Sequence, residues 1–207
     1  MAMNSADRKI METPSEGFSS TFKYAPLEPG WIRLLRLKPS RDPNAPVSCQ
    51  LFDFPLHESG DEPCLYEAVS YVWGDSDTHH SIDIDGSSLP IRRNLYAALR
   101  RFRDKFLERA LWIDALCINQ QDKAERGHQV QEMAKIYRKA DRVTVWLGEG
   151  GDDGNKALEM VADLAANTVT QDITPLRGSE VSLQAVFRLL GRAWFRRVWV
   201  CFHPFRH

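Results

Sequence analysis

Hydrophobic and polar positions alternate along much of the first half of the chain, a period-2 pattern typical of half-buried β-strands. Residues 31–37 (WIRLLRL) and 48–54 (SCQLFDF) alternate on either side of a turn rich in Pro, Asn and Asp, and so predict a β-hairpin. Residues 66–73 (YEAVSYVW) predict a third strand, because aromatic and β-branched residues dominate the segment. Residues 81–84 and 89–91 flank an Asp-Gly turn and predict a second hairpin.

The pattern changes to helical spacing after the second hairpin. Apolar residues recur every three or four positions over residues 95–102, and Asn94 before them can cap the first turn. A longer helix is predicted over residues 124–139, with Asp122 as its N-cap. The positions of this helix expected to form its apolar stripe are Val130, Met133, Ala134, Tyr137 and Ala140.

Two apolar runs on either side of the longer helix predict buried strands, at residues 111–113 and 142–147. Further helical patterns lie around residues 157–164 and 186–190, and residues 198–200 indicate a strand or a helix end. Strands that alternate with helices favour an α/β fold. We therefore expect a mostly parallel, three-layer α/β sheet with an antiparallel β-hairpin annex.

Composition narrows the class of protein. A chain of 207 residues that is 43% hydrophobic can bury a substantial core. Residues 1–29 lack periodicity and predict a flexible leader, so the domain is expected over residues 30–207. Lys and Arg (27) nearly balance Asp and Glu (28), which argues against nucleic acid and against a membrane as partners. No apolar run has signal-peptide or membrane-spanning length, so a cytoplasmic location is expected.

The residue types that bind metals do not form a convincing ligand set in the sequence. The four cysteines are widely spaced, without a Cys-x-x-Cys pair, and are expected to be reduced thiols: Cys49, Cys64, Cys117 and Cys201. Histidine and aspartate residues gather in the second hairpin, at His79, His80, Asp83 and Asp85. We reject a metal site there, because Asp-Gly is ordinary turn chemistry.

The first candidate site follows the predicted strand at residues 111–113. Asp114 lies where this strand should emerge, and ligands of open α/β sheets bind beyond the carboxyl ends of strands. Asp114, Asn119 and Gln120 could hydrogen-bond ribose hydroxyls or an amide. The same side chains could instead cap the next helix and tie the loop to its own backbone. Cys117 could supply a nucleophile, but its apolar neighbours favour a buried, inert thiol.

The second group of candidates interrupts or ends apolar segments. Glu67 is a carboxylate within the strand at residues 66–73, which ends in Trp73 and Gly74. Gly74 permits close approach of a ligand or simply a turn with positive φ. Arg126 could contact a phosphate, or belong to an ordinary salt-bridged helix face with Glu125. Four tryptophans are expected in the core or in a pocket wall: Trp73, Trp112, Trp146 and Trp199.

Five segments together resemble a known family. They are, in order, YEAVSYVWGD, NLYAALRRFR, LWIDALCINQQD, ER..QV..M..IY..A and RVTVWLG. Their order and spacing resemble the heterokaryon incompatibility (HET) domain of filamentous fungi, over residues 66–200. The resemblance implies an effector of non-self recognition that triggers programmed cell death when incompatible hyphae fuse. HET domains are thought to be distant relatives of TIR domains, which implies a TIR-like (flavodoxin-like) fold.

The resemblance also implies a chemistry, since some TIR domains cleave NAD with a glutamate four residues after a tryptophan. The corresponding family segment reads Arg-x-Trp-Val-x-Gln-Glu, whereas residues 197–203 are RVWVCFH and place His203 four residues after Trp199. A carboxylate stabilises an oxocarbenium-like ribose and an imidazole does not. NAD glycohydrolase activity would then need Asp114 or Glu67. The segment 201–207 is unlike the family, as expected of a truncated or divergent end.

These observations leave two functions open. The first is an incompatibility effector that binds or hydrolyses NAD or a related nucleotide, with Asp114 and Glu67 as catalytic carboxylates. Its ligand contacts would come from Trp73, Gly74, Asn119, Gln120 and Arg126. The second is a non-catalytic module, or a degenerate copy of one, that signals through a partner protein or by homo-oligomerisation.

Overall fold

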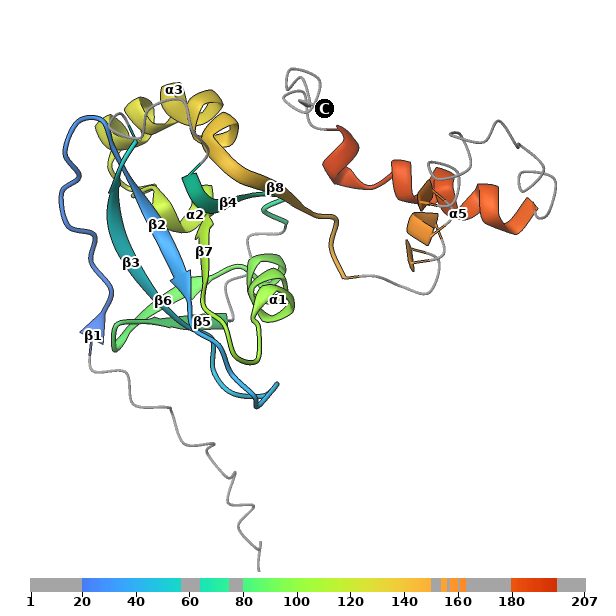
Figure 1. Cartoon of the computed structure of the whole chain (residues 1–207), viewed down its shortest axis with the longest axis horizontal. Helices are drawn as coiled ribbons and strands as arrows, with labels where there is room; N and C mark the ends of the chain where they lie inside the picture. The colour runs from blue at the N-terminus through green and yellow to red at the C-terminus, as the bar shows by residue number, and fades with distance from the viewer. Residues whose placement is uncertain are drawn as a thin grey trace, which may run out of the picture.

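The computed structural model describes residues 20–56, 64–74, 80–149, 154–155, 157–159, 161–162 and 180–196. Within these residues one mixed sheet has the strand order β1-β6-β5-β3-β2-β7-β4-β8 (Figure 1). Its strands are β1 (Ser20–Thr21), β2 (Trp31–Leu37), β3 (Ser48–Pro55), β4 (Cys64–Tyr71), β5 (His80–Ile84), β6 (Ser87–Ile91), β7 (Arg109–Trp112) and β8 (Ala140–Trp146). The helices are α1 (Arg93–Phe102), α2 (Asp114–Cys117), α3 (Lys123–Lys139), α5 (Glu180–Leu190) and the 3₁₀ turn η2 (Ala193–Arg196).

Both predicted hairpins are confirmed. Strands β2 and β3 pair antiparallel in a register that runs from Trp31 opposite Pro55 to Leu37 opposite Cys49. Strands β5 and β6 are joined by the Asp-Gly turn, in which both residues have positive φ. This conformation matches the two-residue turn whose twist suits a hairpin.

The α/β class is confirmed, but the sheet is mixed rather than mostly parallel. Strands β7, β4 and β8 are mutually parallel, whereas β2 pairs antiparallel with both β3 and β7. The hairpins therefore do not form a separate annex. Because β2 pairs with both β3 and β7, it connects the hairpins to the parallel strands in one continuous sheet.

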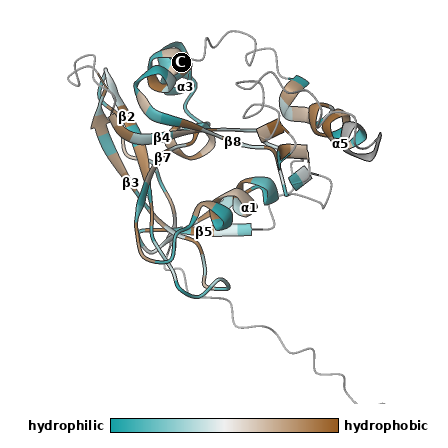
Figure 2. Ribbon diagram, turned by 45° about the vertical axis from the view of Figure 1, so that its right-hand side comes forward, coloured by the Kyte–Doolittle hydropathy of each residue, from teal (hydrophilic) through white to brown (hydrophobic). Residues whose placement is uncertain are grey.

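The parallel strands lie between two helices, which makes this part of the fold three-layered (Figures 1 and 2). Trp146 of β8 makes an edge-to-face contact with Phe102 of α1, with ring centroids 5.9 Å apart. Trp112 of β7 makes a similar contact with Tyr137 of α3, at 5.5 Å. Because side chains alternate along a strand, the sheet register places these two tryptophans on opposite faces.

The predicted apolar stripe of α3 is partly wrong. Val130 is 49% exposed, whereas Gln129 and Lys139 are buried together with Ile136. The buried polar groups bond to carbonyl groups beside the ends of β2 and β3: Gln129 Nε2 donates to the Trp31 carbonyl at 2.9 Å, and Lys139 Nζ donates to that of Leu56 at 3.2 Å. These bonds replace part of the hydration that the side chains lose, although Gln129 Oε1 has no hydrogen-bond partner among the described residues. Polar side chains thus contribute to the buried face of the helix.

Two further predictions need correction. Strand β8 is not buried on both faces, because it lies at the edge of the sheet, and Val143 at its centre is 42% exposed. Asn94 does not cap α1, since Arg92 occupies the N-cap position and makes no side-chain capping bond. The cap of α3 is confirmed, because the Asp122 side chain accepts hydrogen bonds from the backbone N–H groups of Ala124 and Glu125.

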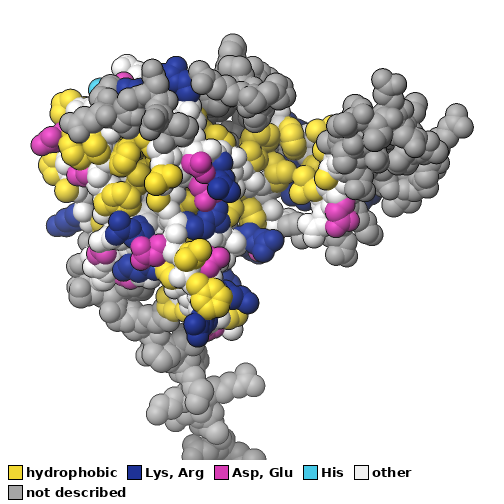
Figure 3. All heavy atoms as spheres, viewed as in Figure 1, with side chains coloured by type: hydrophobic (Ala, Val, Ile, Leu, Met, Phe, Trp, Pro, Cys, Tyr) yellow, Lys and Arg dark blue, Asp and Glu magenta, His cyan; other side chains and the backbone are white. Residues whose placement is uncertain are grey.

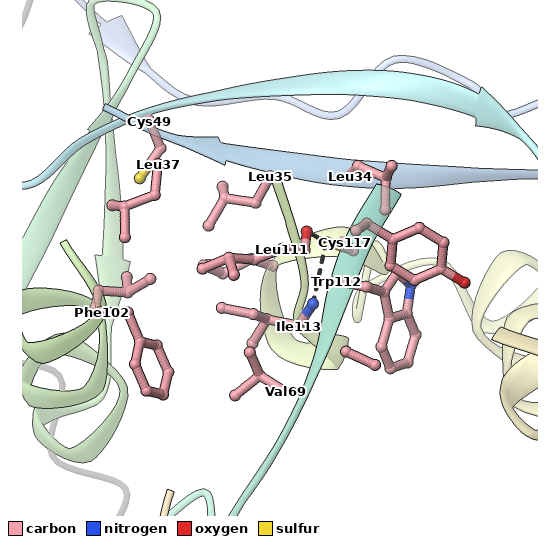
Figure 4. Packing of buried hydrophobic residues seen from close by; sticks show 14 of the residues in the cluster. Leu34, Leu35, Leu37, Cys49, Val69, Phe102, Leu111, Trp112, Ile113 and Cys117 are labelled. Atoms are coloured by element: carbon pink, nitrogen blue, oxygen red, sulfur yellow. Dashed lines mark hydrogen bonds between the residues drawn. The ribbon is translucent and has the colours of Figure 1, made fainter. Parts of the chain in front are cut away.

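The main core fills the space around β2, β7 and β4, and Figure 4 shows Leu35, Leu111, Trp112 and Ile113 packed within it. Residues 20–29, assigned to the leader by composition, contact this body: β1 pairs with β6, and the Tyr24 hydroxyl donates to the Leu116 carbonyl at 3.0 Å. Residues 1–19 and the candidate positions Trp199 and His203 lie outside the described residues. Among the described helices, none is long and apolar enough to cross a membrane.

A second, smaller cluster lies around α5, to the side of the sheet in Figure 1. Ala157, Ala185 and Leu189 are its buried members. The helical segment is tied to the sheet through η2, where Trp194 Nε1 donates to the Ser70 hydroxyl of β4 at 3.0 Å. The helix predicted around residues 186–190 is therefore confirmed as part of α5.

Candidate functional site

Polar side chains gather where the parallel strands β4, β7 and β8 end. Parallel strands present their carboxyl ends at one edge of a sheet, so the segments that follow them meet there. We call this group the strand-end cluster and define it by six residues: Trp73, Gly74, Arg92, Asn94, Asp114 and Trp146. Three of these residues were candidates from sequence, namely Trp73, Gly74 and Asp114.

The centre of the cluster is a hydrogen bond between two predicted site residues. Trp73 Nε1 donates to Asp114 Oδ2 at 3.0 Å, across 41 positions of sequence. The other carboxylate oxygen accepts from the Ala115 backbone N–H at 2.8 Å, and the Asp114 side chain remains partly exposed. The indole donor therefore fixes the orientation of the carboxylate of a residue that is only partly buried.

Arg92 lies over the face of the Trp73 ring, whereas Asp114 lies at the Nε1 edge of the same ring. Its guanidinium carbon is 5.2 Å from the ring centroid, and its NH1 donates to the Gly74 carbonyl at 3.0 Å. A cation over the face of an indole is attracted by the ring quadrupole. Arg92, Trp73 and Asp114 therefore form a chain of a cation, an aromatic ring and an anion.

Asn94 joins the ends of β4 and β8. Its Nδ2 donates to the Val72 carbonyl at 2.5 Å, and its Oδ1 accepts from Trp146 Nε1 at 2.9 Å. Gly74 adopts a φ of +71°, and a Cβ atom added there would lie 3.4 Å from the Asn94 Cβ. The positive φ thus supports the interpretation of Gly74 as a turn residue, because glycine adopts this conformation readily.

Sequence reasoning missed the roles of Arg92, Asn94 and Trp146 in this cluster. The sequence predicts Asn94 as a helix cap and Trp146 as a residue of the core or of a pocket wall. The available signal was their position in the chain. Asn94 lies in the first turn of α1, and Trp146 is the last residue of β8. Only the strand order shows that these ends are neighbours.

The loop after Asp114 is held by its own polar side chains. Gln120 Nε2 donates to the Asp114 carbonyl at 2.8 Å, and Asn119 Oδ1 accepts from the Gln121 backbone N–H at 3.2 Å. Arg126 is exposed, and its NH1 donates to the Gln120 carbonyl at 3.3 Å. In the structure Asn119 and Gln120 make the loop-tying bonds that were the alternative to ligand binding, whereas Arg126 bonds to a backbone carbonyl of the same loop.

Glu125 pairs with Arg33 of β2 and not with its neighbour Arg126. Arg33 NH1 lies 2.5 Å from Glu125 Oε1, and the two side chains are only 4% and 12% exposed. Glu125 Oε1 also accepts from the Asn119 backbone N–H at 2.7 Å. This ion pair fastens the loop and the start of α3 to the centre of the sheet.

Glu67 lies elsewhere on the sheet. It pairs in register with Leu111, so Asp114 comes three residues later, about 10 Å further along the strand direction. Its carboxylate accepts from Arg109 NH2 at 2.5 Å and from the Thr144 hydroxyl at 3.0 Å. Burial acts to raise the pKa of Glu67, but the bonds and charge of Arg109, with Thr144, outweigh it and lower that pKa. The structure therefore does not join the two predicted catalytic carboxylates in one site.

Cys117 is a buried thiol, as the sequence favoured. Its Sγ accepts from the Ile113 backbone N–H at 3.3 Å, the bond drawn in Figure 4. Burial raises the pKa of Cys117 to about 12, and it raises that of Cys49 equally. A thiol with this pKa holds almost no nucleophilic thiolate at neutral pH. Cys64 is also buried.

Fold and site together define an α/β domain whose polar side chains converge beyond the carboxyl ends of parallel strands. The chain belongs to the HET family: the model described as heterokaryon incompatibility protein (HET) matches residues 66–201. That range contains every member of the strand-end cluster, whereas β2, β3 and Arg33 precede it. No solved structure matches the chain.

A curated relative is the heterokaryon incompatibility protein 6, OR allele, of Neurospora crassa. The two sequences are 37% identical over an alignment of 146 positions, and this alignment covers 64% of this chain. The matched segment spans 21% of the relative's own length. The similarity therefore concerns one part of a longer protein.

Proposed function

We propose that the chain acts in fungal heterokaryon incompatibility as an effector domain of non-self recognition and programmed cell death. Membership of the HET family supports this proposal, and so does the similarity to the Neurospora protein. The proposal concerns the role of the domain in the cell. Its biochemical step is argued from the strand-end cluster.

We infer that this step is the binding of a nucleotide such as NAD at the strand-end cluster, followed by cleavage of its glycosidic bond. The observation that carries the inference is the position of Asp114, a partly buried residue whose carboxylate is oriented by Trp73 at the carboxyl ends of parallel strands. A carboxylate in this position can accept bonds from ribose hydroxyls and stabilise positive charge that develops on the ribose. Glu67 cannot serve beside it, because its carboxylate is engaged by Arg109.

The direct test is incubation of the purified chain with NAD while nicotinamide release and NAD binding are both measured. The substitution Asp114→Asn keeps the acceptor for Trp73 and removes the charge. Since a hydrogen bond to a charged group contributes about 1.5–3 kcal/mol, we expect binding to weaken about tenfold or more. Asp141→Asn is the matched control, because Asp141 is an exposed carboxylate on β8.

Three results would count against the nucleotide proposal: no binding of NAD or a related nucleotide by folded protein, equal binding by Asp114→Asn, or equal losses in both variants. A further variant, His203→Glu, restores the carboxylate that the family carries four residues after the tryptophan. We expect it to raise nicotinamide release. An unchanged rate with NAD bound would show that a glutamate at this position does not supply the missing group.

The alternative function is self-association without catalysis. It is favoured by two exposed apolar side chains on α5, Phe187 at 72% and Leu190 at 50%. If the module acts by assembly, the double substitution F187S/L190S should lower the oligomer mass measured by light scattering. A monomer at all concentrations in the unsubstituted chain would exclude this alternative for the isolated protein.

A further inference from the structure

The turn between α1 and β7 presents two large apolar side chains to solvent. Phe106 is 65% exposed and its neighbour Leu107 is 70% exposed. Neither the strand-end cluster nor the core uses them. Single exposed apolar residues are common on protein surfaces. Two adjacent ones on a rigid turn with several positive charges nearby indicate a contact surface.

The turn is held rigid by Asp104. One oxygen of its carboxylate accepts from the backbone N–H groups of Phe106 at 2.7 Å and Leu107 at 3.0 Å. These bonds, that of Phe106 first, lower the pKa of Asp104, so the carboxylate stays charged and bonded at neutral pH. The Asp104 carbonyl accepts from the Ser40 backbone N–H at 3.0 Å, which ties the turn to the loop between β2 and β3.

Basic residues precede the two apolar ones in the chain, and another lies in the loop beside them. The Arg41 guanidinium lies 5.0 Å from the centroid of the Phe106 ring. Arg103 NH1 donates to the Ala45 carbonyl at 2.8 Å and so holds the neighbouring loop in place. We call Phe106, Leu107 and the cations beside them the basic tip. Its cations are Arg41, Arg100, Arg101, Arg103 and Lys105.

The acidic side chains near these cations have other partners, and the Asp42 carboxylate accepts from the Asn44 backbone N–H at 2.8 Å. Among the described residues, none of the five cations of the basic tip forms a salt bridge with a carboxylate. Glu108 instead lies 3.4 Å from Arg36, and Asp85 lies 3.9 Å from Lys38. The Asp104 carboxylate is directed at the backbone. The lower part of the coloured surface in Figure 3 shows apolar side chains with Lys and Arg beside them, and some Asp or Glu as well.

We propose that the basic tip docks on an anionic lipid surface, with Phe106 and Leu107 inserted among the headgroups. The chemistry on both sides matches, because exposed cations are attracted to anionic lipids and apolar side chains gain from leaving water. A protein partner fits less well, since two side chains that project from a turn would need a preformed apolar pocket. This inference goes beyond the proposed function and does not depend on NAD.

The near balance of charge in the whole chain predicts no membrane partner. That prediction uses the total charge of the chain and takes no account of where the charges lie on the surface. Electrostatic attraction to a membrane is screened within about 10 Å, so the local group of charges decides it. The basic tip brings five cations together within two adjoining segments, residues 41 and 100–105. A surface site can therefore coexist with a formal net charge of -1.

The test is co-sedimentation of the full chain with vesicles of phosphatidylcholine alone and of equal parts phosphatidylcholine and phosphatidylserine. We expect binding only to the mixed vesicles. The double substitution F106S/L107S should weaken this binding at least tenfold, because each inserted side chain contributes roughly the free energy gained when an apolar side chain leaves water. The charge reversal R101E/K105E should weaken it at least tenfold as well, since each cation near the surface changes the affinity about fivefold.

Matched controls keep the proposal falsifiable. Leu65→Ser removes a leucine that is 93% exposed at the start of β4, and Arg138→Glu reverses an exposed charge on α3. Neither should change vesicle binding, and F106S/L107S should leave NAD binding as it is. The proposal is overturned if the mixed vesicles do not bind. It is also overturned if F106S/L107S binds them as the unsubstituted chain does, or if Leu65→Ser weakens binding equally, because insertion at this tip is then absent.

Discussion

The buried ion pair between Arg33 and Glu125 yields the sharpest stability prediction. Arg33 NH1 and NH2 donate to the two Glu125 oxygens at 2.5 and 3.0 Å, and NH2 also donates to the Ala25 carbonyl at 2.6 Å. The substitution Arg33→Met keeps an unbranched apolar side chain on β2 and removes all of these donors. Glu125 would then remain a charge in a site where its side chain is 12% exposed.

The expected cost follows from burial. Removing one partner of a buried ion pair typically destabilises a protein by about 3–5 kcal/mol, because the other charge stays uncompensated. With a urea m-value of about 2–3 kcal/mol/M, the midpoint of unfolding should fall by about 1–2.5 M. Circular dichroism during urea titration measures this shift.

Arg36→Met is the matched control on the same strand. Arg36 lies 3.4 Å from Glu108, but the two side chains are 42% and 54% exposed. Exposed pairs contribute about 0–1 kcal/mol, so the midpoint should barely move. The reasoning is refuted if Arg33→Met costs no more than Arg36→Met.

A double substitution separates the loss of the pair from the loss of packing. In R33M/E125L both charges are absent, and apolar replacement of a buried pair is often neutral. The introduced leucine side chain cannot accept from the Asn119 backbone N–H, which now bonds to Glu125 Oε1 at 2.7 Å, so recovery should be partial. A double variant less stable than Arg33→Met alone would show that the stranded charge is not what destabilises the single variant.

Three further predictions follow from the described contacts. Asp122→Ala removes the cap of α3 and should lower the free energy of unfolding by about 1 kcal/mol in urea titration, whereas no change would mean that the cap is redundant. In a Cys201→Ser background the native chain should resist a thiol reagent, and three thiols should react after denaturation, because the other cysteines are buried. Since the folded pKa of Glu67 is lowered, its contribution is present above the unfolded pKa and lost as pH falls through the folded one. Glu67→Gln should therefore flatten the fall of Tm below about pH 5, and an unchanged slope would contradict the sign.

Local signals predicted the elements better than they predicted their neighbours. The two hairpins are confirmed because turn chemistry fixes the pairing of adjacent strands. The pairing of β2 with β7 joins residues about 75 positions apart, such as Leu35 and Leu111, and no local pattern encodes it. The alternation of strands and helices predicts a mostly parallel sheet and gives no sign of this antiparallel pairing.

Helix α3 shows a second limit of sequence patterns. Its apolar stripe was predicted from side-chain polarity, so the prediction includes Val130 and leaves out Gln129 and Lys139. In the structure the two polar side chains are buried because backbone carbonyls are available to them. Polarity alone cannot predict this, since the partners belong to Trp31 and Leu56, far away in sequence.

The candidate site was predictable in its centre and not in its surroundings. Asp114 and Trp73 each follow an apolar strand, and the rule that ligands bind beyond carboxyl strand ends is enough to select both. Their hydrogen bond confirms that the two segments meet. Glu67 was selected only because a carboxylate interrupts an apolar strand, and an ion pair with Arg109 accounts for that interruption.

Arg33 links the loop beside the strand-end cluster to a strand that lies outside the family match. The family match begins at residue 66, yet the loop that follows Asp114 is fastened by a residue of β2. Arg33 NH1 reaches both Glu125 and the Cys117 carbonyl, and Glu125 in turn holds the Asn119 backbone. A chain shortened to the matched range would leave Glu125 without its partner. We therefore expect the strand-end cluster to keep its geometry only when residues 31–37 are present, which NAD binding by the two lengths of chain would test.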